Sequence, residues 1–155
     1  MRFQAIGAQL LQDGTVERLS ADVVRPFYKE RSTVALRLMQ EELTSAMGDE
    51  HPVLVHKPEG CIFLWVWFRD LPISAEELYV RLKAKGVLII PGHLFFPGQE
   101  SVDWAHKHEC IRMSYGSLTN DDDLRRGIRA IAEEAAGAYK EAATFSANTF
   151  APKDS

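Results

Sequence analysis

The stretch CIFLWVWF, residues 61–68, is the strongest indication of regular structure in the sequence. It is rich in aromatic and β-branched residues, which favour a β-strand. The turn-forming sequence KPEG at residues 57–60 precedes it, and VLV at residues 53–55 is typical of a second, shorter strand. We therefore predict two strands joined by this turn, and the rest of the fold is built outward from them.

A helix and two further strands are expected on the C-terminal side. Ser74, with Glu77 three residues later, fits a capping box for a helix that ends at Gly86. Residues 87–90 (VLII) and 110–115 (CIRMSY) are apolar runs of strand length. The predicted order of this part is therefore helix, strand, strand.

Longer helical patterns lie at the two ends of the chain. Between residues 16 and 47, apolar residues return at helical spacing, with Ser20 as a candidate N-cap. Pro26 lacks a backbone N–H, so we expect a break or kink near it. Residues 117–120, with three aspartates after them, are predicted to open a final helix, and its pattern is lost after Tyr139.

Length, composition and charge limit the class of protein. With 155 residues, of which 46% are hydrophobic, we expect one α+β domain over residues 1–155, a small mixed sheet covered by helices, with 141–155 a frayed tail. A net charge of −4 and a pI near 5.7 give no basic field for nucleic acid or anionic lipid. The absence of a signal-like or membrane-spanning stretch, with only two cysteines, predicts a cytoplasmic protein.

Histidine and cysteine side chains near residue 110 could in principle bind a metal. In an extended chain His106, His108 and Cys110 would share one face, with His93 as a fourth candidate ligand. No pair among them has a common zinc spacing, so two loop histidines and a small buried thiol are the favoured interpretation. Cys61 and Cys110 both fall inside predicted strands, where a thiol is inert.

Arg112 is the residue that composition does not explain, because it places a permanent cation inside an apolar run. Burying a guanidinium without a partner costs several kcal/mol, roughly. Three explanations remain open from the residues alone. Arg112 could form an internal ion pair, could point to solvent from an edge strand, or could bind a carboxylate of a ligand through two parallel hydrogen bonds.

Two segments of the sequence are similar to a known family. Residues 56–98 (HKPEGCIFLWVWFRDLPISAEELYVRLKAKGVLIIPGHLFFPG) and 108–115 (HECIRMSY), followed by the final helix, resemble the C-terminal part of fold-type I, class I/II aminotransferases. The shared patterns are P-x-G-x-F, then G-V-x-x-x-P-G-x-x-F, then x-R-[LM]-[SN]-[YF]. RPFYKER at residues 25–31 and the doubled phenylalanine are most similar to the branch that transfers an amino group between valine and pyruvate.

The resemblance implies a role for three residues. In the family, the arginine of the x-R-[LM]-[SN] strand binds the α-carboxylate of the amino-acid or keto-acid substrate, and Arg112 occupies that position. Phe95 and Phe96 would lie near the substrate side chain and shape an apolar pocket for a branched aliphatic group. The resemblance thereby implies an amino-acid or keto-acid substrate, and no role with nucleic acid or a membrane.

The resemblance also implies what the chain does not contain. The family's pyridoxal phosphate is held by a lysine in a serine-rich motif, by an aspartate and by phosphate-binding groups, all upstream of the matched region. No lysine of this chain lies in such a motif. We therefore expect the chain alone to hold no cofactor and to be inactive, while the complete enzyme would be a pyridoxal phosphate enzyme and a homodimer. The alternatives are a stand-alone binding module and, with less support, a metal-binding module.

Overall fold

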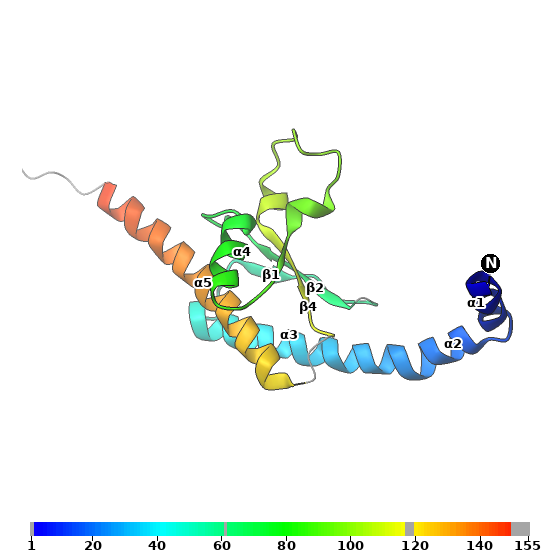
Figure 1. Cartoon of the computed structure of the whole chain (residues 1–155). Coiled ribbons are helices and arrows are strands. Elements are labelled where there is room, and N and C mark those ends of the chain that lie inside the picture. Colours follow the sequence, from blue (N-terminus) through cyan, green and yellow to red (C-terminus); the bar gives the residue numbers. More distant parts are fainter. Residues whose placement is uncertain (1, 61, 117–119, 150–155) are drawn as a thin grey trace, which may run out of the picture.

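The structure is a computed structural model, which describes residues 2–60, 62–116 and 120–149 (Figure 1). Cys61 and residues 117–119, part of the predicted start of the last helix, lie outside the described residues. The predicted order of elements is confirmed within the described residues. The elements are α1 (Arg2–Gln12), α2 (Thr15–Leu19), a π-helical segment (Ser20–Val24), α3 (Arg25–Met47), β1 (Val53–Val55), β2 (Phe63–Phe68), α4 (Ala75–Ala84), β3 (Ile90–Pro91), the 3₁₀ turns η2 (Gly92–Phe95) and η3 (Ala105–His108), β4 (Cys110–Ser114) and α5 (Asp121–Thr149).

The strands form one sheet in the order β1-β2-β4-β3, which confirms the predicted α+β class. Every neighbouring pair of described strands is antiparallel, so the prediction of a mixed sheet was wrong. The reason lies in the connections. Strands β2 and β3 run in the same direction, as expected for strands linked through helix α4, but β4 lies between them and is antiparallel to both.

The two faces of the sheet have different surroundings. Successive side chains of a strand point to opposite faces, so alternate residues of β2 and β4 form two sets. One set joins the hydrophobic core with buried residues of α3, α4 and α5; from β2 and β4 it contains Leu64, Val66, Phe68, Ile111 and Met113. The opposite face carries Phe63, Trp65, Trp67 and Arg112, which are only half-buried.

The N-terminal helix is longer and differently built than predicted. Helix α1 and the N-terminal part of the long helical stretch that follows, beginning with α2, form an arm that projects from the body (Figure 1). No residue of α2 or of the π-helical segment is buried. Ser20 has helical backbone angles, φ −63° and ψ −45°, so the prediction that it caps the helix was wrong. The disturbance expected at Pro26 takes the form of the π-helical segment just before it, which lets the chain continue without that proline's N–H.

Helix α5 also extends beyond its expected end. The apolar pattern weakens after Tyr139, yet the helix continues to Thr149 rather than fraying from residue 141. The added segment contains several alanines, the residue with the highest helix propensity, so local preference favours the helix there. At the other end, the side-chain oxygen of Asn120 accepts a hydrogen bond from the N–H of Asp122, at 2.9 Å. No helix of the described part is both long and apolar enough to cross a membrane.

The start and end predicted for helix α4 from local sequence features are confirmed. The hydroxyl oxygen of Ser74 accepts a hydrogen bond from the N–H of Glu77, at 3.1 Å, at the start of the helix. Gly86 has a φ of 76°, a left-handed value that suits the end of a helix and favours glycine. The strand predicted at residues 87–90 is shorter than expected, because only residue 90 and the following proline pair with β4.

Replacing Ser74 with alanine is expected to lower the free energy of unfolding by about 1 kcal/mol, because an N–H in the first turn loses its acceptor. Urea unfolding followed by circular dichroism measures this difference. Ser101→Ala is the matched control, since Ser101 lies exposed in a turn. Equal losses of stability in the two variants would contradict a capping role.

Candidate carboxylate-binding site

Arg112 lies on a central strand, which removes one of its three explanations. Strand β4 lies between β2 and β3, so it is not an edge strand, and Arg112 pairs in register with Trp65 and with Ile90. Among the described residues no Asp or Glu forms an ion pair with Arg112, which leaves the internal ion pair unsupported. The described part of the chain therefore supports neither an edge strand nor an internal ion pair for Arg112.

Two aromatic rings hold the guanidinium of Arg112. Its central carbon lies 4.8 Å from the ring centroid of Phe63 and 4.9 Å from that of Phe95. Cation–π contacts of this kind stabilise a cation by about 0.5–1 kcal/mol each at exposed sites and restrict the guanidinium's orientation. The N–H donors of an arginine whose plane is fixed in this way suit bidentate binding of a carboxylate.

The same face of the sheet carries a continuous cluster of rings, which we call the aromatic cluster. It consists of Trp65, Trp67, Phe95, Phe96, Trp104 and His106. Trp65 lies edge-to-face against both phenylalanines, with centroid distances of 5.5 Å to Phe95 and 6.1 Å to Phe96. Phe96 in turn contacts Trp104 at 5.0 Å. The structure therefore brings together Arg112, Phe95 and Phe96, the three site residues predicted from the sequence, with Phe95 in direct contact with Arg112.

At the other end of the aromatic cluster, His106 connects Trp104 to Trp67 on strand β2. His106 stacks on Trp104 at 5.1 Å and lies edge-to-face against Trp67 at 4.7 Å. The indole N–H of Trp67 donates a hydrogen bond to the carboxylate of Glu109, at 2.7 Å. The sequence analysis did not assign Trp65, Trp67 or Trp104 to the site. Trp65 and Trp67 are two residues apart in one predicted strand, and this spacing could have placed them on the same face of the sheet.

Gly92 sets how closely turn η2 approaches the sheet. A Cβ atom at position 92 would lie 2.6 Å from the Cβ of Cys110 and 2.7 Å from its carbonyl oxygen, so only glycine fits. This close approach places Phe95, three residues later, beside Arg112. Burial raises the pKa of the Cys110 thiol to about 11, so the thiol stays protonated at neutral pH and is a poor nucleophile.

The four candidate metal ligands form two separate pairs instead of one cluster. His93 stacks on His108 with centroids 5.5 Å apart, while the Cys110 sulfur lies 3.5 Å from Nε2 of His106. Nε2 of His93 is instead 3.1 Å from the carboxylate of Glu76. The described residues contain no group of three or more His, Cys, Asp or Glu side chains placed to hold a metal ion. The metal-binding alternative therefore has no geometric support in the described part of the chain.

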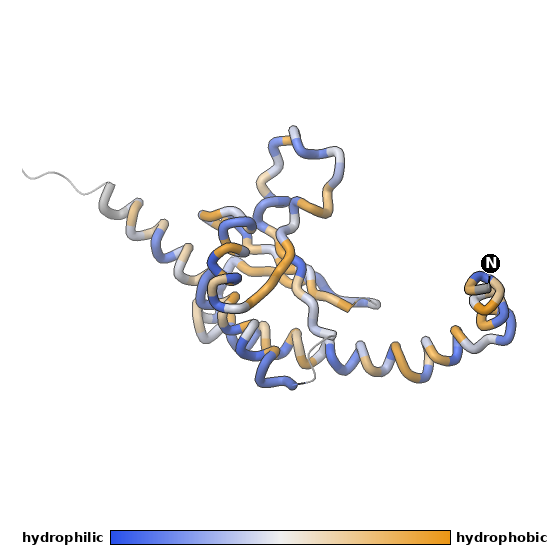
Figure 2. The backbone as a smooth tube through the Cα atoms, in the orientation of Figure 1, coloured by the Kyte–Doolittle hydropathy of each residue, from blue (hydrophilic) through white to orange (hydrophobic). Residues whose placement is uncertain are grey.

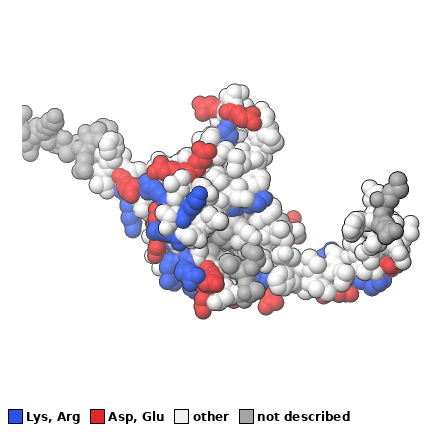
Figure 3. Space-filling view, viewed as in Figure 1, with Lys and Arg blue, Asp and Glu red and all other residues white. Residues whose placement is uncertain are grey.

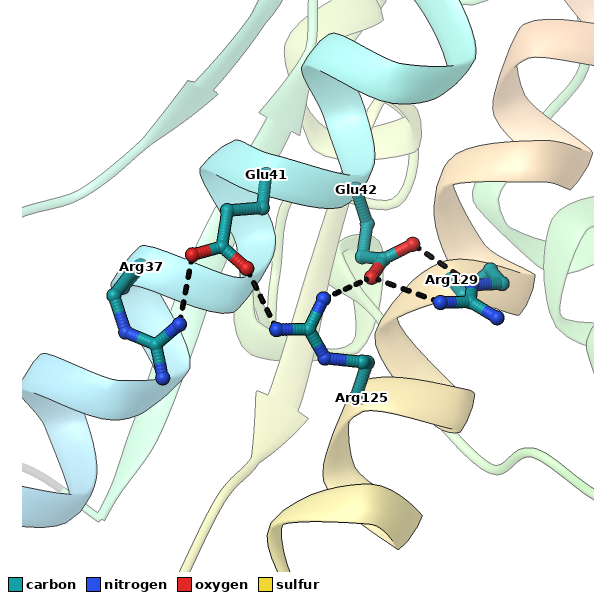
Figure 4. A network of polar contacts seen from close by, with 5 residues as sticks. All are labelled: Arg37, Glu41, Glu42, Arg125 and Arg129. Atoms are coloured by element: carbon teal, nitrogen blue, oxygen red, sulfur yellow. Dashed lines mark hydrogen bonds and ion pairs between the residues drawn. The ribbon is translucent and has the colours of Figure 1, made fainter.

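A second polar network joins the helices on the far side of the sheet (Figure 4). The carboxylate of Glu42 on α3 is only 7% exposed and accepts hydrogen bonds from Arg125, at 2.8 Å, and Arg129, at 2.9 Å, on α5. Arg125 also binds Glu41, at 2.7 Å. Arg125 and Arg129 are four residues apart and so lie on one face of α5, a spacing that could have indicated a shared partner. The network joins α5 to α3.

The described lysines do not fit a covalent bond to pyridoxal phosphate at this site. The ammonium of Lys107 is bound by backbone carbonyl oxygens, and that of Lys85 pairs with Glu134 on α5 at 2.7 Å. Lys83 lies over the ring of Tyr79. The remaining described lysines, Lys29, Lys57 and Lys140, are exposed. Among the described residues, the site therefore consists of a partly exposed face of rings around the guanidinium of Arg112, without a lysine free beside it.

The surface charges of the two signs are mixed rather than segregated. On the face shown in Figure 3, Lys and Arg are interspersed with Asp and Glu over the helices, and no large patch of one sign occurs. The net charge of the chain is −4.

Comparisons with known proteins show similarity to aminotransferases. No protein-family model matches the chain. It is 41% identical over 137 residues to the valine–pyruvate aminotransferase of Escherichia coli (strain K12), a match that covers 88% of this chain and 31% of that protein. The valine–pyruvate aminotransferase of Salmonella typhimurium LT2 matches with a TM-score of 0.76 and 42% identity, over 88% of this chain and 33% of that one.

A more distant solved structure is also similar to this chain. The α-aminoadipate aminotransferase of Thermus thermophilus, solved with N-(5′-phosphopyridoxyl)-L-leucine, is 26% identical with a TM-score of 0.62, over 86% of this chain and 30% of that one. This chain thus spans about a third of the length of the relatives that it matches. Over most of its own length, the chain is therefore homologous to one domain-sized part of the fold-type I aminotransferases of the valine–pyruvate type.

Proposed function

We propose that the chain is the C-terminal, substrate-clamping domain of a valine–pyruvate type aminotransferase, and that Arg112 binds the substrate carboxylate. One observation carries the proposal: within the described residues, Arg112 lies on a central strand, between two aromatic rings, without a carboxylate partner. A cation held in this way is available to an anion from outside the chain. The resemblance of the strand motif supplies the identity of that anion as an amino or keto acid.

Phe95 and Phe96 have distinct parts in the proposed site. Phe95, 38% exposed, stacks on Arg112 and restricts the plane in which the guanidinium can bind. Phe96 is more buried than Phe95. Its ring contacts those of Trp65 and Trp104, and Trp65 in turn contacts Phe95. Together they form an apolar wall beside the carboxylate-binding group, which suits the branched side chain of valine better than a charged one.

In the complete enzyme, bound pyridoxal phosphate would supply the chemistry for amino-group transfer between valine and pyruvate. The residues of this chain would bind and orient the substrate carboxylate, and the aromatic cluster would exclude water around it. The cofactor-holding residues would come from the part of the relatives that this chain does not match. The proposal includes a cytoplasmic location and a homodimer for the complete enzyme.

Binding of a keto acid by the chain tests the role of Arg112. Titration with pyruvate and with the 2-oxo acid of valine is expected to shift the side-chain NMR signal of Arg112, with weak affinity because only part of the site is present. Arg112→Lys is expected to weaken binding by roughly tenfold or more, since lysine cannot form the bidentate contact. Arg126→Lys, a change at a 77% exposed arginine paired with Asp123, is the control. Equal affinities in all three proteins would contradict the proposal.

The chain by itself is expected not to transaminate. The test is incubation with pyridoxal phosphate, L-valine and pyruvate, with alanine measured against a blank that contains cofactor and substrates only. Alanine formed above that blank would overturn the assignment of this chain as a non-catalytic part of the enzyme.

A stand-alone binding module is the second candidate function, and exposed apolar residues favour it. Phe3 is 90% exposed, and Leu19 and Val23 on the projecting arm are more than half exposed. Figure 2 shows these hydrophobic segments along the arm, away from the body. Exposed apolar surface of this extent marks an interaction site. Sedimentation that shows a defined dimer of the isolated chain, together with no keto-acid binding, would favour this function over the first.

A further inference from the structure

Lys107 is a buried cation without a role in the site described so far. Its side chain is 4% exposed, although lysine is among the residues least often buried without a partner. Its ammonium donates hydrogen bonds to the backbone carbonyl oxygens of Gln99, at 2.6 Å, and Val102, at 2.7 Å, and lies 3.5 Å from that of Glu100. An ammonium has three donors, so three carbonyl oxygens can satisfy it.

The three carbonyls belong to one loop, residues 97–104, which projects from the body beside the sheet (Figure 1). Two weak turns shape its backbone, with 3.2 Å hydrogen bonds from Gln99 N–H to the Phe96 carbonyl and from Val102 N–H to the Gln99 carbonyl. The side chains at residues 97–104 are all exposed, so apolar burial contributes little to its shape. Among the described side chains, Lys107 binds the loop backbone at the most points, while the carboxylate of Glu100 accepts one hydrogen bond from the N–H of Gly98, at 3.1 Å.

The loop begins and ends at members of the aromatic cluster. Phe96 precedes it and Trp104 closes it, and the two rings contact each other with centroids 5.0 Å apart. Phe95, the neighbour of Phe96, contacts Arg112. A change in the loop's shape would therefore move the rings at its base and, through them, the ring that stacks on the guanidinium.

We propose that Lys107 is a positioning residue for the carboxylate site. By binding three backbone carbonyls it fixes loop 97–104, and this holds Phe95 and Phe96 where they orient Arg112. The effect on a ligand rests on the proposed function of Arg112, whereas the effect on the rings does not. The two can therefore be tested separately.

The ring geometry has a spectroscopic signature. The Nε–H signal of Arg112 in a ¹H–¹⁵N spectrum of the full chain should be displaced by the ring currents of Phe63 and Phe95, and Arg112→Gln identifies it by its loss. Lys107→Met keeps the length of the side chain but removes the ammonium, and is expected to abolish more than half of this displacement. Lys57→Met, at an exposed lysine paired with Glu59, is the control and should leave the displacement unchanged.

A second variant keeps the test decisive if Lys107→Met does not fold. Replacing residues 98–103 with two glycines removes all three carbonyls and leaves Lys107 in place. It is expected to reduce the displacement to the same degree, since the exposed loop is removed without a change in the core. An undisturbed Arg112 signal in a folded Lys107→Met protein, or in the shortened protein, would overturn the proposal.

Keto-acid binding separates this proposal from the function on which it rests. If wild-type protein binds pyruvate and Arg112→Lys does not, Lys107→Met is expected to bind about tenfold more weakly, which corresponds to about 1.4 kcal/mol. If Lys107→Met binds pyruvate with wild-type affinity, only the proposed role of Lys107 is overturned, and the proposed function of Arg112 stands. The wild-type chain could also bind no keto acid while the Arg112 signal still depends on Lys107. That result would overturn the proposed keto-acid binding and retain the proposal that Lys107 positions the rings.

Discussion

Gly92→Ala is expected to lower the free energy of unfolding by about 3 kcal/mol and to separate Phe95 from Arg112. The added methyl group would lie 2.6 Å from the Cβ and 2.7 Å from the carbonyl oxygen of Cys110, well inside van der Waals contact. Backbone atoms of a central strand cannot move aside as a flexible side chain can. Turn η2 must therefore shift outward, at the cost typical of overpacking a core. Urea unfolding and the Arg112 side-chain NMR signal measure the two effects.

Gly127→Ala is the matched control for this substitution. No heavy atom outside the local helix lies within 4 Å of a Cβ placed at residue 127 in helix α5. Alanine there is expected to raise the free energy of unfolding by about 0.5–1 kcal/mol, because it is the better helix former. A Gly92→Ala protein as stable as the wild type, with an unchanged Arg112 signal, would show that the close contact of η2 with the sheet does not position Phe95.

Glu42→Gln is expected to lower the free energy of unfolding by about 2 kcal/mol, the second large effect. The carboxylate of Glu42 is 7% exposed and joins two helices through Arg125 and Arg129 (Figure 4). Breaking a buried ion pair costs about 3–5 kcal/mol, but these arginines are partly exposed and can turn to water, which reduces the loss. Glu41→Gln, at a 42% exposed carboxylate, is the control and should have a much smaller effect.

The loss of stability caused by Glu42→Gln is expected to depend on pH, with a definite sign. Hydrogen bonding from Arg129 holds the pKa of the Glu42 carboxyl below its ordinary value of 4.5, against the opposing effect of burial. A carboxyl whose pKa is lowered in the folded state contributes stability that is present above the unfolded pKa. That stability is lost as the pH falls through the lower, folded value. The difference between wild type and Glu42→Gln should therefore stay constant near pH 6–7 and shrink below about pH 4.5; a difference that grows on acidification would contradict it.

Local signals in the sequence were sufficient where the physical cause was itself local. The Ser74 cap and the left-handed Gly86 bound helix α4 as predicted, since each acts within a few residues. Where a distant partner decided the outcome, the sequence was insufficient. Strand β4 lies between β2 and β3 and makes the sheet antiparallel, and no residue near any one strand encodes which neighbour it will find.

The candidate site divides along the same line. The sequence by itself showed that Arg112 is an unusual cation in a predicted strand and that no lysine of a Schiff-base motif is present, and the resemblance predicted Phe95 and Phe96 near the substrate side chain. Only the tertiary structure decided that Phe63 and Phe95 hold the guanidinium, that Gly92 brings turn η2 onto β4, and that Glu42 is buried between two arginines. The physical reason is that pattern and propensity act along the chain. Ring stacking, close packing and ion pairing join residues far apart in it, and are fixed only when the sheet and helices have assembled.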